Sequence, residues 1–320
     1  MVIPPPVYCA SCETCNPVPQ GPDMLGIGMS GWSYPAGNPS ATLSPCFNPR
    51  NADEVAYDKI TNSRFDGLWV TNLRTRQQRQ IVPATARWAG QKRWSTTGWL
   101  SATDVIQDIW KVKANGDSLT QLTFTHAYST PQWSPDGLRL ASAVSTAAGR
   151  SVAILDSGGT LLQRLVLPNA YAEPLAWSPD GTRLLLSLAQ SPNPGPGAVP
   201  AGFYLYHFAT GQTTLLFNAT TQQIQGAFSK GFDWTPDNRA LIWASSIGLY
   251  RIDAQTGAGT LLRKNCESRT YAYPSVSADG RTILVERTSY EVRGTPRNLH
   301  IDVDIYAMDI DGSNERKLVL

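Results

Sequence analysis

The chain has 320 residues, of which 42% are hydrophobic and 16% charged, and its formal net charge is +2. A near-neutral chain has no basic surface to attract nucleic acid or an anionic membrane, so we expect neither partner. The sequence has no run of about 18 apolar residues, and no membrane span is predicted.

The chain begins with a segment, residues 1–40, that is rich in Pro, Gly and Ser and shows no sustained periodicity. Such a composition predicts an N-terminal arm or tether that leads into the fold. Its first residues, Met1–Pro6, lack the basic and apolar regions of a signal peptide, so none is predicted. The least polar part, Met24–Tyr34, is where we expect the arm to lie against the domain.

A recurring motif organises the rest of the chain. Residues 131–137 read Pro-Gln-Trp-Ser-Pro-Asp-Gly, residues 177–181 repeat Trp-Ser-Pro-Asp-Gly, and degraded copies stand at 234–238 and 276–280. Aligned on the tryptophan, the copies recur every 41 to 57 residues, which matches the period of a four-stranded propeller blade. The aligned positions are Phe47, Trp88, Trp133, Trp177, Trp234 and Val276.

Each unit of the repeat reads as four short strands, a to d. Strand a ends at the aligned residue, strand b follows the turn, strand c is apolar, as in Val152–Leu155, and strand d closes the unit, as in Gln163–Leu167. Short strands separated by turn signals are typical of all-β proteins. We therefore predict that residues 41–320 form a six-bladed β-propeller of four-stranded antiparallel blades. The predicted blades span about 41–82, 83–123, 124–167, 168–217, 218–264 and 265–320.

The Ser-Pro-Asp-Gly turn of the motif has a structural explanation. Proline sets φ at the first corner, the Asp side chain bonds backbone amides, and Gly adopts the positive φ that ends the turn. The adjacent Trp is large enough to fill the gap between neighbouring blades. We therefore interpret the repeated carboxylates as structural rather than catalytic, and they are Asp136, Asp180, Asp237 and Asp279.

These repeats resemble the WD40-like repeats of TolB-type propellers. A unit of that family runs Pro-x-Trp-Ser-Pro-Asp-Gly, an apolar strand, Ile-Tyr-x-x-Asp and Leu-Thr. Residues 131–137 match the first part, Ile305–Asp309 match the third strand, and Leu122-Thr123 matches the end. The resemblance implies a propeller over residues 41–320, export to the periplasm or cell surface, and binding of a protein partner without catalysis. It is less informative about function than about fold, because propellers host binding, scaffolding and enzymatic roles.

The antiparallel order of the strands separates two faces of the predicted ring. The a–b and c–d turns share one face, and the b–c loops and d–a linkers share the other. Length varies mainly in the b–c loops, at residues 62–67, 101–108, 190–202 and 289–298. Because variable loops on a rigid scaffold usually carry binding, we expect the b–c/d–a face to be functional.

Aromatic side chains stand near the start of strand a in four successive units, with polar residues close by. We predict that they form a crescent around the central opening that binds a peptide or a glycan. The alternative is that these rings simply pack between blades. The predicted binding residues are Tyr128, Tyr171, Glu173, Phe228, Lys230, Arg269, Tyr271 and Tyr273, with His126 nearby.

Signals of enzymatic chemistry are weak in this sequence. The three histidines, His126, His207 and His300, fall at different points of their repeats, so no metal site is predicted. A Gly-x-Ser-x-Gly elbow, a phosphate-binding loop and a dinucleotide fingerprint are lacking, so no catalytic residue or cofactor is predicted. Residues Asp309–Glu315 resemble the start of a calcium loop, but they occupy the recurring c–d turn, which favours a structural role.

The five cysteines leave at least one thiol unpaired within the chain. One of them lies in the linker that enters the last unit, beside the first unit, where the N-terminal arm must arrive. We therefore expect a disulfide between this linker and the arm, with a cysteine-only metal site and a redox Cys-x-x-Cys as alternatives. The fifth, Cys46, is predicted to be a buried thiol. The cluster concerned comprises Cys9, Cys12, Cys15 and Cys266.

Together these features predict a non-catalytic, TolB-like interaction module of the cell envelope that acts as a monomer. Its partner would be a protein or peptide, or a glycan, held on the b–c/d–a face around the central channel. The alternative is a propeller enzyme, either a lyase or a glycan-active protein, that uses the channel. Converging carboxylates, histidines or a metal at the channel mouth would favour the enzyme, and an aromatic rim would favour binding.

Overall fold

The computed structural model describes residues 40–320 apart from positions 63, 87, 148, 168, 170, 190–196, 219–230, 267, 294–297 and 319. In this part of the chain the structure is almost entirely β, with strands β1–β24 and one short 3-10 turn, η1 (Ala84–Ala86). The all-β class that the repeat predicted is confirmed. The strands form a propeller-like arrangement of antiparallel four-stranded sheets.

Two sheets open the chain, and each follows the chain order of its strands. The first comprises β1 (Ser40–Asn48), β2 (Asn51–Thr61), β3 (Arg64–Asn72) and β4 (Gln78–Val82). The second comprises β5 (Trp88–Trp94), β6 (Trp99–Asp104), β7 (Ile109–Lys113) and β8 (Thr120–Gln121).

The middle of the chain forms one eight-stranded sheet. Its first half comprises β9 (Tyr128–Trp133), β10 (Arg139–Thr146), β11 (Gly149–Asp156) and β12 (Leu161–Arg164). Its second half comprises β13 (Tyr171–Trp177), β14 (Arg183–Ala189), β15 (Gly202–His207) and β16 (Gln212–Asn218). The halves are two antiparallel runs, and one parallel pairing between Arg150 of β11 and Tyr171 of β13 joins them.

Two four-stranded sheets end the chain. One comprises β17 (Phe232–Trp234), β18 (Ala240–Ala244), β19 (Gly248–Asp253) and β20 (Gly259–Lys264). The other comprises β21 (Arg269–Val276), β22 (Thr282–Arg293), β23 (Asn298–Asp309) and β24 (Arg316–Lys317). Within the loop predicted at residues 289–298, Ser289–Arg293 belong to β22 and Asn298 to β23, and the residues between them lie outside the described part of the chain.

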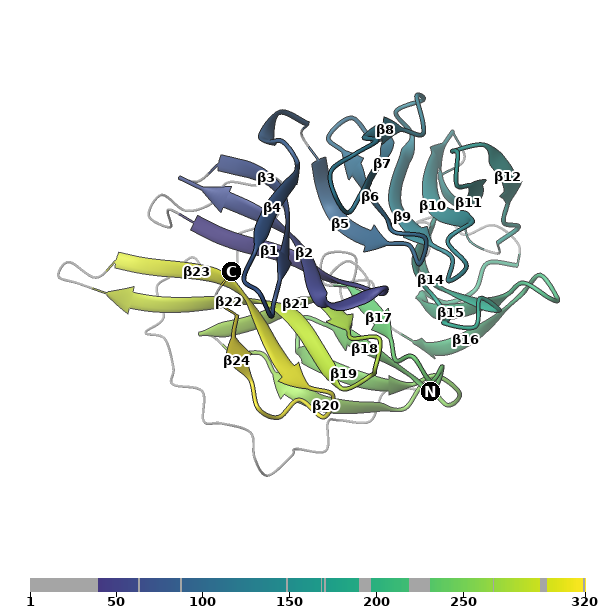
Figure 1. The fold of residues 1–320 in the computed structure, drawn as a ribbon. Helices are drawn as coiled ribbons and strands as arrows, with labels where there is room; N and C mark the ends of the chain where they lie inside the picture. The colour runs from purple at the N-terminus through teal and green to yellow at the C-terminus, as the bar shows by residue number, and fades with distance from the viewer. Residues whose placement is uncertain are drawn as a thin grey trace.

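The sheets follow one another around a ring, so that the first and last sheets lie side by side (Figure 1). Strand β1 contacts β21, β22 and β23. A buried apolar cluster fills this junction, with Phe47, Val55 and Tyr57 from the first sheet packed on Leu284 and Ile305 from the last. The ring therefore closes by apolar packing of its last sheet on its first.

The repeated turn is built as the sequence predicted. In the turn after β13, the Ser178 hydroxyl donates to the Asp180 carboxylate at 2.6 Å. The same carboxylate accepts the backbone N–H of Thr182 at 3.0 Å, and Gly181 has φ of 71°. The turns after β9, β17 and β21 repeat the hydroxyl–carboxylate and backbone bonds. These carboxylates are thus occupied in holding the a–b turns.

The motif tryptophans also join neighbouring four-stranded units, either within the eight-stranded sheet or between sheets. Trp177 donates its indole N–H to the carbonyl of Gln132 at 3.0 Å, and Trp234 donates to Ala176 at 3.3 Å. In the second sheet Trp94, rather than Trp88, makes this contact, with the carbonyl of Cys46 at 3.1 Å. The alignment on Trp88 was wrong, because the turn after β5 reads Ser-Thr-Thr-Gly and lacks the Pro-Asp pair.

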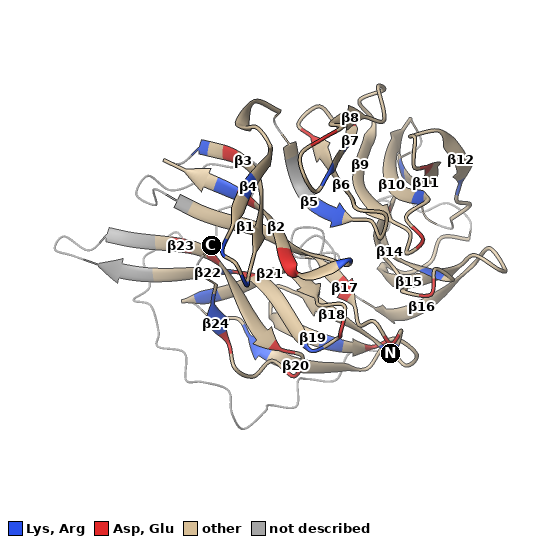
Figure 2. Ribbon diagram, viewed as in Figure 1, with Lys and Arg blue, Asp and Glu red and all other residues tan. Residues whose placement is uncertain are grey.

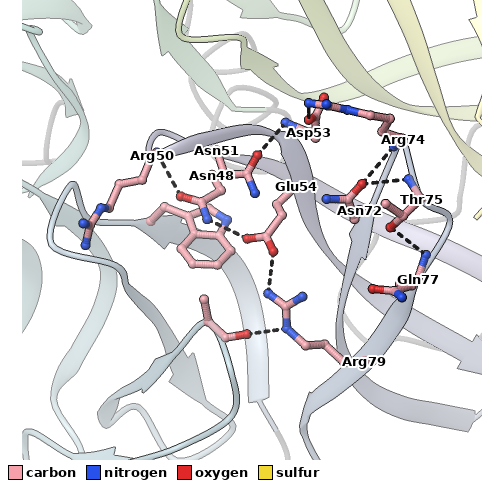
Figure 3. Close-up of polar contacts among 12 residues, drawn as sticks. Asn48, Arg50, Asn51, Asp53, Glu54, Asn72, Arg74, Thr75, Gln77 and Arg79 are labelled. Carbon is pink, nitrogen blue, oxygen red and sulfur yellow. Dashed lines mark hydrogen bonds and ion pairs between the residues drawn. The ribbon is translucent and has the colours of Figure 1, made fainter.

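The a–b and c–d turns of the first sheet carry a polar network (Figure 3). Glu54 accepts hydrogen bonds from Asn48 and Arg79, both at 2.8 Å. Arg79 also donates to the carbonyl of Ala114 in the turn between β7 and β8, at 2.8 Å. The a–b and c–d turns are therefore tied to one another and to the next sheet.

The innermost strands are irregular at mid-length. Register shifts interrupt the pairing of β1, β5, β9, β13 and β21 with their neighbours. Within these shifts Ser44, Thr130 and Tyr273 adopt positive φ of 49°, 51° and 50°, each directly before a proline. Bulges of this kind re-aim side chains. The inner strands therefore present side chains that simple alternation does not predict.

Candidate functional site

The strand order places the b–c loops and d–a linkers at one end of the sheets, and we call this end the loop face. The loop between β6 and β7, Val105–Asp108, lies here beside the linker between β8 and β9. Tyr128 donates its backbone N–H to the carbonyl of Gln107 at 2.9 Å, which ties the linker to the loop. Lys and Arg positions alternate with Asp and Glu positions over the described sheets (Figure 2).

A buried carboxylate holds this part of the loop face in place. Asp108 is fully buried and accepts hydrogen bonds from the Thr123 hydroxyl at 3.0 Å and from the backbone N–H of His126 at 3.1 Å. The Nδ1 atom of His126 lies 2.7 Å from the same carboxylate. Since a buried carboxylate needs such partners, Asp108 fixes the linker against the loop.

A second carboxylate orders the loop itself. Asp104 accepts the backbone N–H groups of Ile106 at 3.0 Å and Asp108 at 2.9 Å. It also accepts the indole N–H of Trp110 at 2.8 Å. The loop is therefore held on a fixed framework, and sequence inspection missed it because no motif marks these aspartates.

Large apolar side chains are exposed on this framework. Phe124 is 71% exposed, and Val105 and Ile106 of the adjacent loop are exposed by more than half. At the next linker of the loop face, Val166 is 89% exposed and Tyr171 45%. We call these five residues the loop-face patch. Exposed apolar side chains that rigid loops hold out to solvent are a feature of interaction surfaces.

Three of the four aromatic residues of the predicted crescent lie in the described part of the chain, and they differ in exposure. Tyr171 is exposed and Tyr128 is half-buried against the core beneath it. Tyr271 is fully buried, and its hydroxyl donates to Glu315 at 3.0 Å. The ring of Tyr271 packs in the core that joins the last two sheets, which favours the alternative that this aromatic residue packs between blades. Phe228 lies outside the described residues.

The predicted polar neighbours are also distributed. Glu173 is buried and forms an ion pair with Arg150, and burial raises the pKa of its carboxyl while the arginine lowers it. Arg269 lies over the ring of Tyr271, 5.6 Å from its centroid. Tyr273 is half-buried, and burial and the nearby carboxylates of Glu286 and Asp58 raise the pKa of its phenol. Lys230 lies outside the described residues.

A buried charged cluster, not foreseen from the sequence, lies where the first, second and last sheets meet. Lys92 of β5 forms an ion pair with Asp58 of β2, and both residues are buried. Glu286 of β22 accepts the backbone N–H of Ser44 at 2.9 Å. Burial raises the pKa of Asp58 and the neighbouring Lys92 lowers it. Tyr273 completes this cluster through its electrostatic contact with the two carboxylates.

Arg93 connects inner strands from distant parts of the chain. Its Nε atom donates to Gln132 at 2.8 Å, and its Nη2 atom donates to the carbonyl of Phe232 at 3.0 Å. Asp233 accepts the backbone N–H of Val276 at 2.7 Å, and burial raises its pKa while Arg93 lowers it. Arg93, Gln132 and Asp233 each directly precede a motif tryptophan, a signal that the misplaced alignment on Trp88 concealed.

Two of the five cysteines lie in the described part of the chain. Within it, no group of three His, Cys, Asp or Glu side chains could hold a metal ion. Cys46 is buried, as predicted, and burial raises the pKa of its thiol to about 11. Cys266 is half-buried, and the predicted disulfide stays a prediction because its proposed partners in the arm, Cys9, Cys12 and Cys15, lie outside the described residues.

The acidic c–d turn at Asp309–Glu315 uses its carboxylates locally. Asp311 accepts the backbone N–H of Ser313 at 2.8 Å and its hydroxyl at 2.6 Å. Asp309 accepts the side-chain amide of Asn314 at 2.6 Å. These bonds favour the structural interpretation of the turn.

Among the described residues, no helix is long and apolar enough to cross a membrane.

Comparison with known proteins supports the fold. No protein-family model matches the chain, and no curated protein matches it in sequence. Among solved structures, the chain is similar to a putative TolB from Agrobacterium tumefaciens, with 18% identity and a TM-score of 0.60 over 78% of this chain and 87% of that one. It is also similar to TolB from Acinetobacter baumannii, with 15% identity and a TM-score of 0.57 over 87% of this chain and 63% of that one.

An enzyme is also among the similar structures. An oligogalacturonate lyase in complex with manganese matches with 11% identity and a TM-score of 0.50, over 87% of this chain and 77% of that one. At these identities the similarity concerns the fold alone. The same architecture therefore carries different functions, and the function of this chain must be argued from its own residues.

Proposed function

We propose that this chain is a non-catalytic, TolB-like interaction module of the cell envelope, periplasmic or at the cell surface, that binds a protein partner on its loop face. We count its blades as six, taking the eight-stranded sheet as two, and assign residues 41–320 to the propeller and residues 1–40 to an arm. The solved TolB structures support this proposal through their shared fold.

The loop-face patch is the observation that carries the proposal. Phe124, Val105 and Ile106 expose apolar area on a segment that Asp104 and Asp108 hold in one conformation. A surface that is already ordered loses little conformational entropy when a partner binds. Tyr171 and Val166 extend the apolar character of the same face to the next linker. Such a surface favours an apolar or aromatic segment of another protein.

Paired variants test this role. The tagged protein would capture partners from a native envelope fraction as wild type, as a loop-face variant, Phe124→Ser, and as a matched control, Leu162→Ser. Leu162 is an exposed apolar residue on the outer strand β12, so the control removes similar apolar area elsewhere. We expect the same captured protein with wild type and control, and its loss with Phe124→Ser. Equal capture by all three would contradict the proposal.

A propeller enzyme remains the second candidate, because the buried cluster of Lys92, Asp58, Glu286 and Tyr273 brings carboxylates together near the inner strands. Lys92 and Asp58 are buried and paired with each other, which favours a structural role for the cluster in joining the sheets. Incubation with oligogalacturonate, with and without manganese, distinguishes the two functions. We expect no unsaturated product. Product formation that is lost in Lys92→Met, with the fold retained, would establish the enzyme instead.

A further inference from the structure

The last sheet carries a polar pocket away from the loop-face patch. The pocket has a volume of about 240 Å³ and draws on all four strands of the sheet, β21 to β24. Its charged lining residues are Arg269, Arg287, Asp302, Asp304 and Lys317, and its aromatic ones are Tyr290 and Tyr306. Its volume is below the range of about 300–1,000 Å³ that is usual for drug-sized ligands, so it suits a smaller molecule.

The charged side chains of the pocket alternate in sign from β22 to β24, with Arg287 on β22, two aspartates on β23 and Lys317 on β24. Asp304 of β23 pairs with Arg287 of β22, and Asp302 of β23 pairs with Ser289 of β22. On the other side of β23, Lys317 Nζ lies 2.6 Å from Asp304 Oδ2. The hydrogen bond to Asp304 raises the pKa of Lys317, and the charge of Asp302 acts in the same direction. Strand β23 therefore supplies both carboxylates of the pocket lining, and one of them, Asp304, is paired with Lys317.

The β22 side of the pocket is cationic. Arg287 Nη1 bonds Glu315 Oε1 at 2.8 Å, and its guanidinium lies 4.3 Å from the ring centroid of Tyr306. Its Nε atom is buried without a hydrogen-bond partner in the described structure. This atom is covered by its own surroundings, so Arg287 acts on the pocket through the charge of its guanidinium. Arg269 adds a second guanidinium at the start of β21.

The charges of the pocket nearly balance. Its three cations face Asp302 and Asp304 in the lining and Glu315 directly behind Arg287. A ligand of net charge would leave a charge uncompensated in this partly buried space, which is unfavourable. A neutral ligand that carries one group of each sign would be matched at both ends.

We propose that this pocket binds a small zwitterion of the α-amino acid type. Its carboxylate would lie toward the guanidinium groups of Arg287 and Arg269, and its ammonium group would lie toward Asp302 and Asp304. The site is separate from the loop-face patch and does not rest on the proposed interaction role, so either proposal can fail without the other.

A ligand series on the unaltered protein tests this site. Titration calorimetry would compare L-alanine with L-alaninamide, which lacks the carboxylate, with N-acetyl-L-alanine, which lacks the ammonium group, and with D-glucose. We expect saturable binding of alanine, a loss of about tenfold or more in affinity for either analogue, and no binding of glucose. Absence of alanine binding, equal binding of the analogues, or binding of glucose would overturn the proposal.

A pair of variants then locates the site. Asp302→Asn removes one predicted contact of the ammonium group, and Asp311→Asn removes a carboxylate of the adjacent exposed turn that lies outside the pocket. Thermal unfolding establishes that both variants are folded. We expect alanine affinity to fall about tenfold in Asp302→Asn and to stay unchanged in Asp311→Asn. Equal affinities in the two variants would place the binding elsewhere.

Discussion

At the scale of single residues, the repeated turn shows how a motif that looks catalytic acts as a structural element. In the turn after β13, the Ser178 hydroxyl donates to the carboxylate of Asp180, two positions later. The same hydroxyl accepts the backbone N–H of Arg183, the first residue of strand b. Both polar groups of the pair are satisfied by the turn itself. These bonds give the pair a structural role in the turn.

Removal of one of these carboxylates should destabilise the fold measurably. Asp180→Ala loses the bonds from Ser178 and from both the N–H and hydroxyl of Thr182. We expect the free energy of unfolding to fall by about 1–2 kcal/mol, measured by chemical denaturation. Asp117→Ala, in the turn between β7 and β8, is the control and should cost less. Equal losses of unfolding free energy in the two variants would show that Asp180 stabilises the fold no more than an aspartate in another turn.

The same bonds give the turn carboxylates a distinctive titration. The Ser277 hydroxyl and the N–H of Arg281 hold the pKa of Asp279 below its usual value, and the Thr235 hydroxyl does the same for Asp237. Because the folded pKa lies below the unfolded value of about 3.9, these groups stabilise the fold above that pH and cease to do so as the pH falls through the folded pKa. Carboxyl NMR titration should place both midpoints below about 3.9, and midpoints at or above it would contradict this account.

Burial should protect the Cys46 thiol. Its pKa is raised to about 11, mainly because burial disfavours the thiolate. Since the thiolate is the reactive form, we expect alkylation at about pH 8 to leave Cys46 unmodified in the folded protein and to modify it after denaturation. Peptide mapping by mass spectrometry measures both states. Equal labelling of the folded and denatured protein would show that the site is open.

At the scale of strands and sheets, the outer parts of the repeat were predictable and the inner parts were not. Turn chemistry marks the start of strand b wherever the Pro-Asp pair is present, but the turn after β5 lacks it, and Trp88 was chosen in place of Trp94. Bulges in the inner strands then shift the side-chain alternation, and a shift of one residue reverses which face a side chain occupies. Tyr271 therefore lies in the core, and the charged cluster around Lys92 could not be located by counting from the motif.

Two matched leucines test how the ring closes. Leu284 of β22 packs on the first sheet, and Leu185 of β14 packs on the sheet that begins with β17; both are fully buried. The two leucines occupy equivalent positions in the repeat. Leu284 follows Ile283, which pairs with the aligned position Val276, and Leu185 follows Leu184, which pairs with the aligned position Trp177. We expect Leu284→Ala and Leu185→Ala each to cost about 2–5 kcal/mol in denaturant unfolding. A much smaller loss for Leu284→Ala would mean that the ring is loosely closed.

At the scale of the whole molecule, the two faces of the ring differ in kind. The a–b and c–d turns satisfy their own polar groups and link neighbouring sheets, as Arg79 does between Glu54 and Ala114. The loop face instead exposes apolar side chains, such as Phe124, that are not part of the repeated motif. The buried carboxylates of Asp104 and Asp108 order the loop beside Phe124. The sequence predicted which face to consider, through its variable loops, but the exposure of Phe124 and Val166 depends on tertiary contacts that no local pattern records.

Site-specific photo-crosslinking in the native envelope tests the central claim most directly. A photoreactive residue would replace Phe124 or Val166 on the loop face, and Leu138, which is 60% exposed at an a–b turn, as the control of similar exposure. We predict an adduct with one and the same partner protein from both loop-face positions and none from Leu138. Adducts of equal yield from Leu138 would contradict the assignment of this face to protein binding. The absence of adducts from all three positions, together with a measurable lyase activity, would contradict it as well.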